Sequence, residues 1–271
     1  EFMSYCALKG MERNLVPVDL EEIYARQARP TQRTLLDEAQ DEPTRKTVLC
    51  FVKKEAYGDC KDPRVITNFP SRDKLVWAQF VYALADQFKK LPFYGFSRSP
   101  AAIDKHVAFC CGWAQSMVMT DFKRFDGTIL PIFRRFEETF MCYWFPTCYH
   151  AEILECLDAT YNNVIVGKHG TVYKQETATG SGDLATSLFN SLRNGFAGYA
   201  SARESGFSVI ESYAILDHSL YGGDDGMTPN VPVATYVSTT DKYGLILTKS
   251  VVQHGDPGVE FLARRYGRDV W

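Results

Sequence analysis

The chain has 271 residues and a hydrophobic content of 45%, which is enough to bury a substantial core as one large domain or as two coupled lobes. This composition excludes a disordered adaptor protein. The formal net charge of −3 excludes binding of nucleic acid through overall basicity, although lysines and arginines gather locally in residues 26–33, 53–64 and 264–268.

The first part of the chain is charge-rich up to about residue 47. From Lys53 to Ile66 we expect two strands joined by a turn, with Lys53 and Lys54 on the first strand and Arg64 opening the second. These cations can grip one phosphate chain, Arg by bidentate contacts and Lys as a point charge, or they are ordinary surface charges. A helix is expected from Ser71 to Phe88, because apolar residues recur there on one face.

The apolar run Met117–Thr120 predicts a buried strand that places Asp121 at its carboxyl end, where sites on open sheets usually lie. Asp126 stands just before a glycine, where the chain turns into a helix marked by phenylalanines at three- and four-residue spacing. The alternatives are a strand-end cap for Asp121 and a helix N-terminal acid for Asp126.

A hairpin is expected from Asn163–Val166 and Thr171–Gln175. It leads into the glycine-rich loop Thr179–Asp183, which contains Ser181 and Gly182 and runs into a helix with leucines at every fourth position.

On this helix Thr186 and Asn190 share a polar face with Asp183, and such a face can hydrogen-bond a ribose hydroxyl. The alternative is an ordinary helix start that Ser181 or Asp183 caps.

Residues 219–225 read Ser-Leu-Tyr-Gly-Gly-Asp-Asp and predict a tight hairpin that offers Asp224 and Asp225 at its tip. Two like charges side by side raise a pKa or require a cation. If Asp121 faces Asp224, the two strands provide the oxygen ligands that magnesium prefers. The alternative is a solvated turn, since Gly-Asp and Asp-Gly are common turn sequences.

The eight cysteines do not predict a disulfide framework or a zinc finger. Cys142, Cys148, His150 and Cys156 lack the C-x-x-C spacing of zinc ligands. We expect reduced, mostly buried thiols, with structural zinc as the less favoured alternative.

No signal peptide opens the chain, and no uncharged apolar run reaches the ~20 residues that a membrane span needs. We therefore expect no membrane segment in this sequence. Glu1-Phe2 before Met3 is typical of an expression vector.

These blocks, in this order, resemble the RNA-dependent RNA polymerases of positive-strand RNA viruses. The matching segments are residues 53–66 for motif F, 121–126 for motif A, 181–190 for motif B, 221–225 for motif C, 241–249 for motif D and 260–265 for motif E. The sequences Lys-Lys-Glu-Ala-Tyr and Asp-Phe-Lys-Arg-Phe-Asp-Gly-Thr are similar to those of nodaviruses.

The resemblance implies an α+β right-hand polymerase, with a palm made of an antiparallel sheet with helices packed behind it and with mostly helical fingers. Residues 1–115 would form the fingers region with motif F, and residues 116–271 the palm with motifs A to E, with room for fingers insertions within 127–178. The chain stops soon after the motif E match, so the thumb is expected to be absent.

The resemblance also implies template-directed transfer of a nucleotide from an NTP to an RNA 3′-hydroxyl by a two-metal mechanism with Mg²⁺ or Mn²⁺. Asp121 and Asp224 would hold the metal, with Asp225 as a weaker ligand. Lys249 would protonate the departing pyrophosphate, with Lys242 as its competitor.

The remaining implied site residues contact the nucleotide or the primer. Nucleotide contacts are implied for Lys53, Lys54, Arg64, Asp126, Ser181, Gly182, Thr186 and Asn190, and primer contacts for Phe261, Leu262 and Arg264. Asp126 and Asn190 would read the ribose 2′-hydroxyl.

The implied partners are an RNA template and primer, nucleoside triphosphates and other replicase regions. The implied location is the host cytoplasm, at membrane-associated replication complexes reached through regions outside this sequence. The main alternative is a thumb-less fragment that binds RNA or replicase partners with weak or no activity. A reverse transcriptase is disfavoured because Gly223 precedes the aspartates, and a metal-dependent nuclease would leave residues 53–64 and 181–190 without a role.

Overall fold

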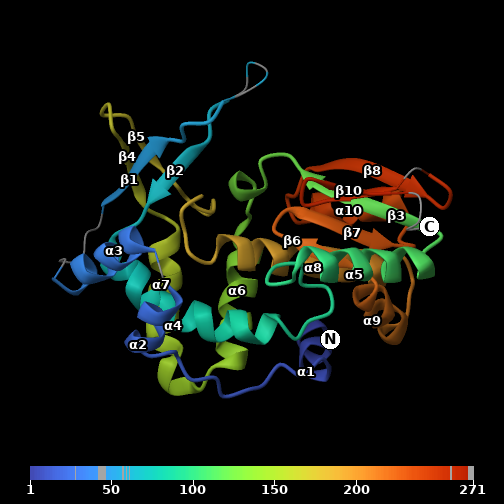
Figure 1. Ribbon diagram of the computed structural model, residues 1–271, viewed down its shortest axis with the longest axis horizontal. Coiled ribbons are helices and arrows are strands. Elements are labelled where there is room, and N and C mark those ends of the chain that lie inside the picture. The colour runs from blue at the N-terminus through green and yellow to red at the C-terminus, as the bar shows by residue number, and fades with distance from the viewer. Residues whose placement is uncertain are drawn as a thin grey trace. The chain divides into compact units, whose positions relative to one another are not determined.

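The computed structural model of the chain describes residues 1–27, 29–41, 47–56, 58, 60, 62–256 and 258–267. The chain forms two units, drawn with all their elements in Figure 1. Unit 1 comprises Glu1–Glu12, Ala85–Phe133 and Ser187–Trp271, and unit 2 comprises Arg13–Leu84 and Arg134–Thr186. The fold is mixed α+β, and each unit has a four-stranded sheet.

Unit 1 is built on an antiparallel sheet of strand order β6-β7-β3-β8. Its elements are α1 (Phe2–Leu8), α5 (Pro100–Trp113), β3 (Ser116–Phe122), the 3₁₀ turn η1 (Phe125–Gly127), α8 (Thr186–Glu204), α9 (Val209–Asp217), β6 (Leu220–Gly222), β7 (Asp225–Pro229), α10 (Val233–Lys242), β8 (Leu247–Gln253), β9 (Val259–Phe261) and β10 (Arg264–Tyr266). Strands β9 and β10 form a separate hairpin.

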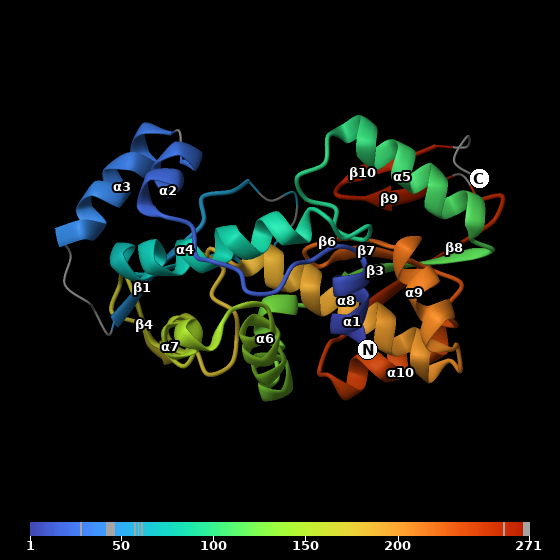
Figure 2. The ribbon, with the colours of Figure 1, turned by 90° about the horizontal axis from the view of Figure 1, so that it is seen from below.

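The central strand β3 alternates its side chains between two helical layers. Met117 and Met119 belong to an apolar cluster with Ile103 and Val107 of α5. On the opposite face, Thr120 hydrogen-bonds to α8. Figure 2 shows α5 on one side of the sheet and α9 and α10 on the other. The predicted strand and the predicted antiparallel sheet with helices behind it are therefore present in unit 1.

Helix α8 is buried along most of its length, and two of its glycines accommodate aromatic rings. A methyl group at Gly198 would overlap the hydroxyl oxygen of Tyr221 on β6, and one at Gly195 would lie 3.1 Å from the Phe93 ring. Tyr221 is fully buried, and its hydroxyl lies 2.8 Å from Thr228 Oγ1. The absence of these two side chains lets β6 approach the helix closely.

The first residues of the chain belong to the core of unit 1. The Phe2 ring lies 5.7 Å from that of Phe196 and 5.8 Å from that of Tyr199, and only 5% of its surface is exposed. Tyr5 donates a hydrogen bond to Asp217, and Lys9 forms an ion pair with the same carboxylate. Phe2 is therefore part of the packed core of unit 1.

Unit 2 combines helices with a sheet of strand order β2-β1-β4-β5, in which β1 and β4 are parallel. Its elements are α2 (Leu20–Arg26), α3 (Pro30–Asp41), β1 (Thr47–Val52), β2 (Val65–Asn68), α4 (Ser71–Phe88), α6 (Pro131–Trp144), the 3₁₀ turn η2 (Thr147–Tyr149), α7 (His150–Thr160), β4 (Val164–Gly167) and β5 (Val172–Lys174). Helices α4 and α6 continue into unit 1 along the chain. Strands β4 and β5 form the predicted hairpin, and α4 has the predicted bounds.

The strands around the first basic block differ from the prediction. β1 ends at Val52, so Lys53 and Lys54 lie after the strand, and β2 begins at Val65, after Arg64. The first half of β1, Thr47–Cys50, pairs with β4, and its second half, Leu49–Val52, pairs with β2, so the apolar run forms the strand. A hydrogen bond from Lys53 N to Arg64 O nevertheless keeps the two basic ends together, at 2.8 Å.

All of the described cysteines are free, as expected, but the expectation that most are buried is wrong: only Cys6, Cys110 and Cys111 are buried, and Cys60 and Cys148 are exposed. Burial raises the pKa of the Cys111 thiol to about 12 and that of Cys156 to the same value, so both are protonated at neutral pH. Among the described helices, none is long and apolar enough to cross a membrane.

We predict that Gly198→Ala destabilises the protein by about 1–3 kcal/mol, because the added methyl group overlaps the rigid, buried Tyr221 ring. The free energy of unfolding by urea measures this effect. Gly112→Ala in α5 is the matched control, since no atom lies within 4 Å of its added methyl group, and it should stabilise by about 0.5–1 kcal/mol. Equal stability of the Gly198→Ala variant and the wild type would show that α8 and β6 can separate at no cost.

Candidate metal and nucleotide site

Three aspartates gather at one end of the unit 1 sheet. Asp121 lies near the carboxyl end of β3, and Asp224 and Asp225 lie at the β6–β7 turn. The register pairs Thr120 of β3 with Gly226 of β7. Asp121 directly follows Thr120 and Asp225 directly precedes Gly226, so the two aspartates lie next to this pair on adjacent antiparallel strands. The predicted approach of the two segments is therefore present.

The turn that carries Asp224 is a two-residue connection between the paired residues Gly222 and Asp225. Gly223 has φ +73°, the conformation that glycine adopts at little cost, whereas Asp224 is not in the left-handed region. A glycine at the first central position is typical of a hairpin turn of type II′. The Gly-Gly-Asp-Asp sequence thus directly determines how the first carboxylate is presented.

Helix α8 fixes this turn through two polar side chains. Gly223 N donates a hydrogen bond to Ser191 Oγ at 2.8 Å, and Asn194 Nδ2 donates to the Asp224 carbonyl at 2.9 Å. Asn194 Nδ2 also lies 3.2 Å from Thr120 Oγ1 on β3. Asn194 therefore connects the two segments that carry the carboxylates. Sequence reasoning missed Ser191 and Asn194, although their polar character within an otherwise buried helix is a signal for such a role.

The Asp225 carboxyl has a raised pKa, for which burial is the main cause. The neighbouring charges of Asp224 and Asp121 raise the pKa further, and a hydrogen bond from the backbone of Leu262 opposes the shift. The three carboxylates are therefore close enough to destabilise one another in the absence of a cation.

This set of oxygen donors fits a hard divalent cation. A raised carboxyl pKa caused by like charges is the electrostatic state that a bound cation relieves. In the part of the chain that the structure describes, no three His, Cys, Asp or Glu side chains are already arranged as a coordination shell. The carboxylates that could hold Mg²⁺ or Mn²⁺ are Asp121, Asp224 and Asp225, completed by water or substrate oxygens.

A second polar chain lies beside these carboxylates on unit 1. Asn190 Nδ2 donates a hydrogen bond to Asp126 Oδ1 at 2.7 Å, and Arg193 Nη1 donates to Asn190 Oδ1 at 2.6 Å. Asn190 and Arg193 are buried, whereas Asp126 is half-buried at the η1 turn. The sequence predicted that Asp126 and Asn190 act together, and the structure brings them into contact.

A pocket of about 710 Å³ extends from Asp121 and Asp225 along the open face of β3 and β8 to the β9–β10 hairpin. Its far side is lined by Glu260, Phe261 and Leu262. Within the predicted primer segment, Phe261 is buried and Arg264 is exposed. Leu262 (φ +49°) and Ala263 (φ +56°) form the hairpin turn in the left-handed region, which is uncommon for residues other than glycine.

The lysine predicted as a proton donor, Lys249, lies on β8 and pairs with Thr120, one residue before Asp121. Its side chain lies outside the described atoms. The competing Lys242 forms an ion pair with Glu204 at the end of α8. Asp121 itself pairs with Thr248, and successive strand residues alternate between the two faces of the sheet, so the register does not place Lys249 on the face of Asp121. The choice between Lys249 and Lys242 stays a prediction.

Unit 2 carries the remaining predicted nucleotide-binding residues. Lys53 forms an ion pair with Glu55, and Arg64 Nε lies 3.9 Å from the other oxygen of the same carboxylate. Lys54 is exposed beside them. Lys61, within the same basic block, lies outside the described residues. The structure thus brings Lys53 and Arg64 together, with Glu55 between them.

The glycine-rich loop of unit 2 packs on β2. A methyl group at Gly182 would overlap the Thr67 carbonyl oxygen, and one at Gly180 would lie 2.6 Å from the Phe69 ring. Ser181 is exposed, and Thr186 Oγ1 donates hydrogen bonds within the loop, at 2.8 Å to the Asp183 carbonyl. The glycines are therefore required by close packing as well as by backbone freedom.

Comparison with known proteins gives a consistent result. A model of the viral RNA-dependent RNA polymerase family matches residues 69–268. The chain is 30% identical over 263 residues to the RNA-directed RNA polymerase of Atlantic halibut nervous necrosis virus, covering 94% of this chain and 26% of that protein. It is 24% identical over 271 residues to the RNA-directed RNA polymerase of Nodamura virus (strain Mag115), and this match covers 93% of this chain and 25% of that protein.

The structure is similar to that of an insertion loop deletion mutant of the RNA-dependent RNA polymerase of a human picobirnavirus, with a TM-score of 0.71. The match covers 82% of this chain and 44% of that one at 18% identity, so it bears on the fold alone. The chain spans about a quarter of the length of the curated relatives it matches. These findings agree with the resemblance expected from the sequence.

We predict that Asp225→Asn raises the melting temperature at pH 7 in metal-free buffer. The folded state binds the Asp225 proton more tightly than the unfolded state does, so wild-type stability falls as the pH rises from 3.8 through the raised pKa. Asparagine removes this cost. Solvent screens the half-buried carboxyl, so the gain in the free energy of unfolding should be at most ~1 kcal/mol. For a domain of this size, that gain raises the melting temperature by about 2–4 °C.

Thermal melts between pH 4 and pH 8 test this expectation, with Asp104→Asn on the exposed side of α5 as the control. The gain should shrink as the pH approaches 3.8, where the carboxyl is increasingly protonated in both states. A lower melting temperature for Asp225→Asn at pH 7 would contradict the electrostatic account.

Proposed function

Because the chain belongs to the viral RNA-dependent RNA polymerase family, we propose that it is the catalytic core of such an enzyme and transfers nucleotides from NTPs to an RNA 3′-hydroxyl. The family assignment rests on a match that covers most of the chain, including every carboxylate of the site. The activity of the whole polymerase is a proposal for this chain, which spans about a quarter of its relatives.

The observation that carries the proposal is the grouping of Asp121, Asp224 and Asp225 at the end of the unit 1 sheet, with the Asp225 pKa raised by burial and, further, by the other two charges. Hydrogen bonds from α8 to the backbone of the turn hold Asp224 in a position where like charges gather, an arrangement that a purely structural role does not account for. These residues would hold two Mg²⁺ or Mn²⁺ ions. When bound, such ions activate the primer hydroxyl and neutralise charge on the triphosphate.

The protein itself mainly positions and neutralises. Ser191 and Asn194 hold the turn that presents Asp224, so the carboxylate does not have to reorganise when substrate arrives. The Leu262 backbone holds Asp225. This preorganisation matches the need of in-line phosphoryl transfer for fixed charges at fixed positions.

Asp126 and Asn190 are proposed to recognise the ribose of the incoming nucleotide. Asn190 occupies Oδ1 of Asp126, so a 2′-hydroxyl is expected to donate to Oδ2, a contact that a deoxynucleotide cannot make. Arg193 fixes the orientation of the Asn190 amide. Ser181, Gly182 and Thr186 are proposed to line the nucleotide site from the glycine-rich loop.

Lys53, Lys54 and Arg64 are proposed to bind the triphosphate. In the structure Glu55 neutralises two of them, and a triphosphate would replace its carboxylate with more negative charge. Lys249 is proposed to protonate the leaving pyrophosphate, a role that the resemblance to motif D implies. Phe261, Leu262 and Arg264 are proposed to contact the primer.

In the right-hand description, residues 1–115 are proposed as fingers with motif F, and residues 116–271 as palm with motifs A to E. The proposed partners are RNA template and primer, nucleotides and other replicase regions. The proposed setting is a membrane-associated replication complex in the host cytoplasm.

A function in binding RNA without extending it is the second candidate, favoured by the one-quarter coverage of the curated relatives. A reverse transcriptase is not favoured, because the contact between Asp126 and Asn190 suits a 2′-hydroxyl.

We predict that the chain extends an annealed RNA primer in Mg²⁺ or Mn²⁺ and that Asp224→Ala reduces incorporation on the order of 10³-fold, because a metal ligand is lost. Gel-resolved extension with labelled primer measures this rate. Asp104→Ala, which removes an exposed carboxylate from α5 outside the motifs, is the control. RNA binding without extension by the wild type would instead support the second candidate.

We also predict that Asn190→Ala lowers the preference for ribonucleotides over deoxynucleotides by roughly tenfold or more, since Asp126 loses the amide that orients it. The ratio of kcat/KM for ATP and dATP measures this preference. Equal use of the two nucleotides by the wild type would refute the role given to Asp126 and Asn190.

A further inference from the structure

Arg134, near the start of α6, is a buried arginine outside all of the sequence motifs described above. Only 4% of its side chain is exposed, and the side chain of its ion-pair partner Glu137 is fully buried, with Arg134 Nη1 2.9 Å from Glu137 Oε2. Removing two charges from water is costly, and a well-packed apolar pair is often at least as stable. The ion pair therefore calls for a function beyond stability.

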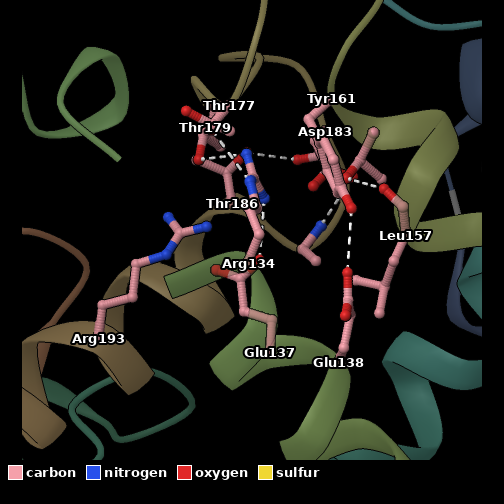
Figure 3. Close-up of polar contacts among 12 residues, drawn as sticks. Arg134, Glu137, Glu138, Leu157, Tyr161, Thr177, Thr179, Asp183, Thr186 and Arg193 are labelled. Carbon is pink, nitrogen blue, oxygen red and sulfur yellow. Dashed lines mark hydrogen bonds and ion pairs between the residues drawn. The ribbon is translucent and has the colours of Figure 1, made fainter. Parts of the chain in front are cut away.

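The guanidinium also binds the chain that leads into the glycine-rich loop. Arg134 Nε donates to the Thr177 carbonyl at 3.0 Å, and Nη2 donates to Thr179 Oγ1 at 3.3 Å. Figure 3 shows the Arg134 side chain directed from α6 toward these two threonines. Its charged centre also lies 4.7 Å from the centre of the Tyr161 ring. The guanidinium thus makes hydrogen bonds to Glu137, Thr177 and Thr179 and one contact with an aromatic ring. Thr177 and Thr179 both lie within three residues before Gly180.

The glycine-rich loop is held on its other side by β2. Gly180 contacts the Phe69 ring, and Gly182 packs against the Thr67 backbone so closely that no side chain fits. Thr67 lies on β2, the strand that begins directly after Arg64. The loop therefore contacts Arg134 of α6 on one side and β2 on the other. β2 directly follows Arg64, a proposed triphosphate ligand.

A loop with two glycines has high conformational entropy when it is not tethered. Glu176 before it adopts φ +53°, which is an unfavourable backbone conformation that surrounding contacts must maintain. Tethering at Thr177 and Thr179 offsets both costs and leaves the exposed Ser181 in a defined place. Lysine at position 134 would keep the charge but not the planar fork that reaches Glu137 and both threonines.

We propose that Arg134 is a positioning residue for nucleotide binding: through its contacts to Thr177 and Thr179 it holds the Gly180–Asp183 loop in its binding conformation. Glu137 serves this role by orienting and neutralising the guanidinium. The link to the nucleotide rests on the proposed function, whereas the effect on the loop does not.

The test compares the 271-residue wild type with the double variant Arg134→Met and Glu137→Leu, which replaces the ion pair by apolar side chains of similar size. Hydrogen–deuterium exchange is expected to rise in peptides covering residues 176–186 and to stay unchanged in α7 and α4. In primer extension KM for ATP should rise roughly 5- to 10-fold with kcat changed less than about twofold, because ground-state positioning is lost. Arg134→Lys should show the same pattern more weakly.

Tyr161→Phe is the matched control, because it removes the hydrogen bond to Glu138 but keeps the ring beside Arg134. It should change neither exchange in residues 176–186 nor KM. If the double variant does not fold, Thr179→Val replaces it, since this change removes only the acceptor of Nη2 and keeps the ion pair.

Unchanged exchange in residues 176–186 of a folded variant would overturn the proposal. A uniform rise across unit 2 would also overturn it, since that result indicates a stability role alone. The exchange measurement does not depend on catalysis, so failure of wild-type extension would count against the proposed function and leave the positioning of the loop to be decided separately.

Discussion

The hydrogen bonds from α8 to the β6–β7 turn are the interactions on which the candidate site depends. Ser191 accepts from Gly223 N, and Asn194 donates to the Asp224 carbonyl, so the turn is held from within the core. A two-residue turn with adjacent aspartates has no internal means of keeping its charges in place. The buried helix α8 thereby holds the exposed Asp224 in a fixed position.

This arrangement also explains why the charged site does not disrupt the fold. Like charges around Asp225 raise its pKa, which is a cost to the folded state at neutral pH. Two features offset that cost. One is the hydrogen bond from the Leu262 backbone, and the other is the apolar cluster beneath β3, which includes Met117 and Tyr266. The unit therefore stores electrostatic strain at the place where a cation can relieve it.

The sequence was sufficient to predict the parts of the site that depend on local pattern. Asp121 at a strand end and Asp224 in a glycine turn follow from apolar runs and turn residues, and the contact between Asp126 and Asn190 followed from the family resemblance. The strand near Lys53 was placed too late, because β1 begins where it pairs with β4, more than 100 residues away, and ends where its pairing with β2 stops. Partners such as Arg134 with Thr179 were not predictable either, since no periodicity records a contact across 45 residues.

The close approach of Gly198 to the Tyr221 hydroxyl has an evolutionary consequence. The space for a side chain at position 198 exists only if the ring at position 221 is smaller or displaced, so neither position can change freely while the other is kept. Across relatives of this chain the two positions should co-vary, with glycine at 198 accompanying tyrosine at 221 and larger residues appearing at 198 only with smaller ones at 221. The tyrosine next to the two glycines would then be retained for packing against α8, independently of any contact with nucleotide or RNA.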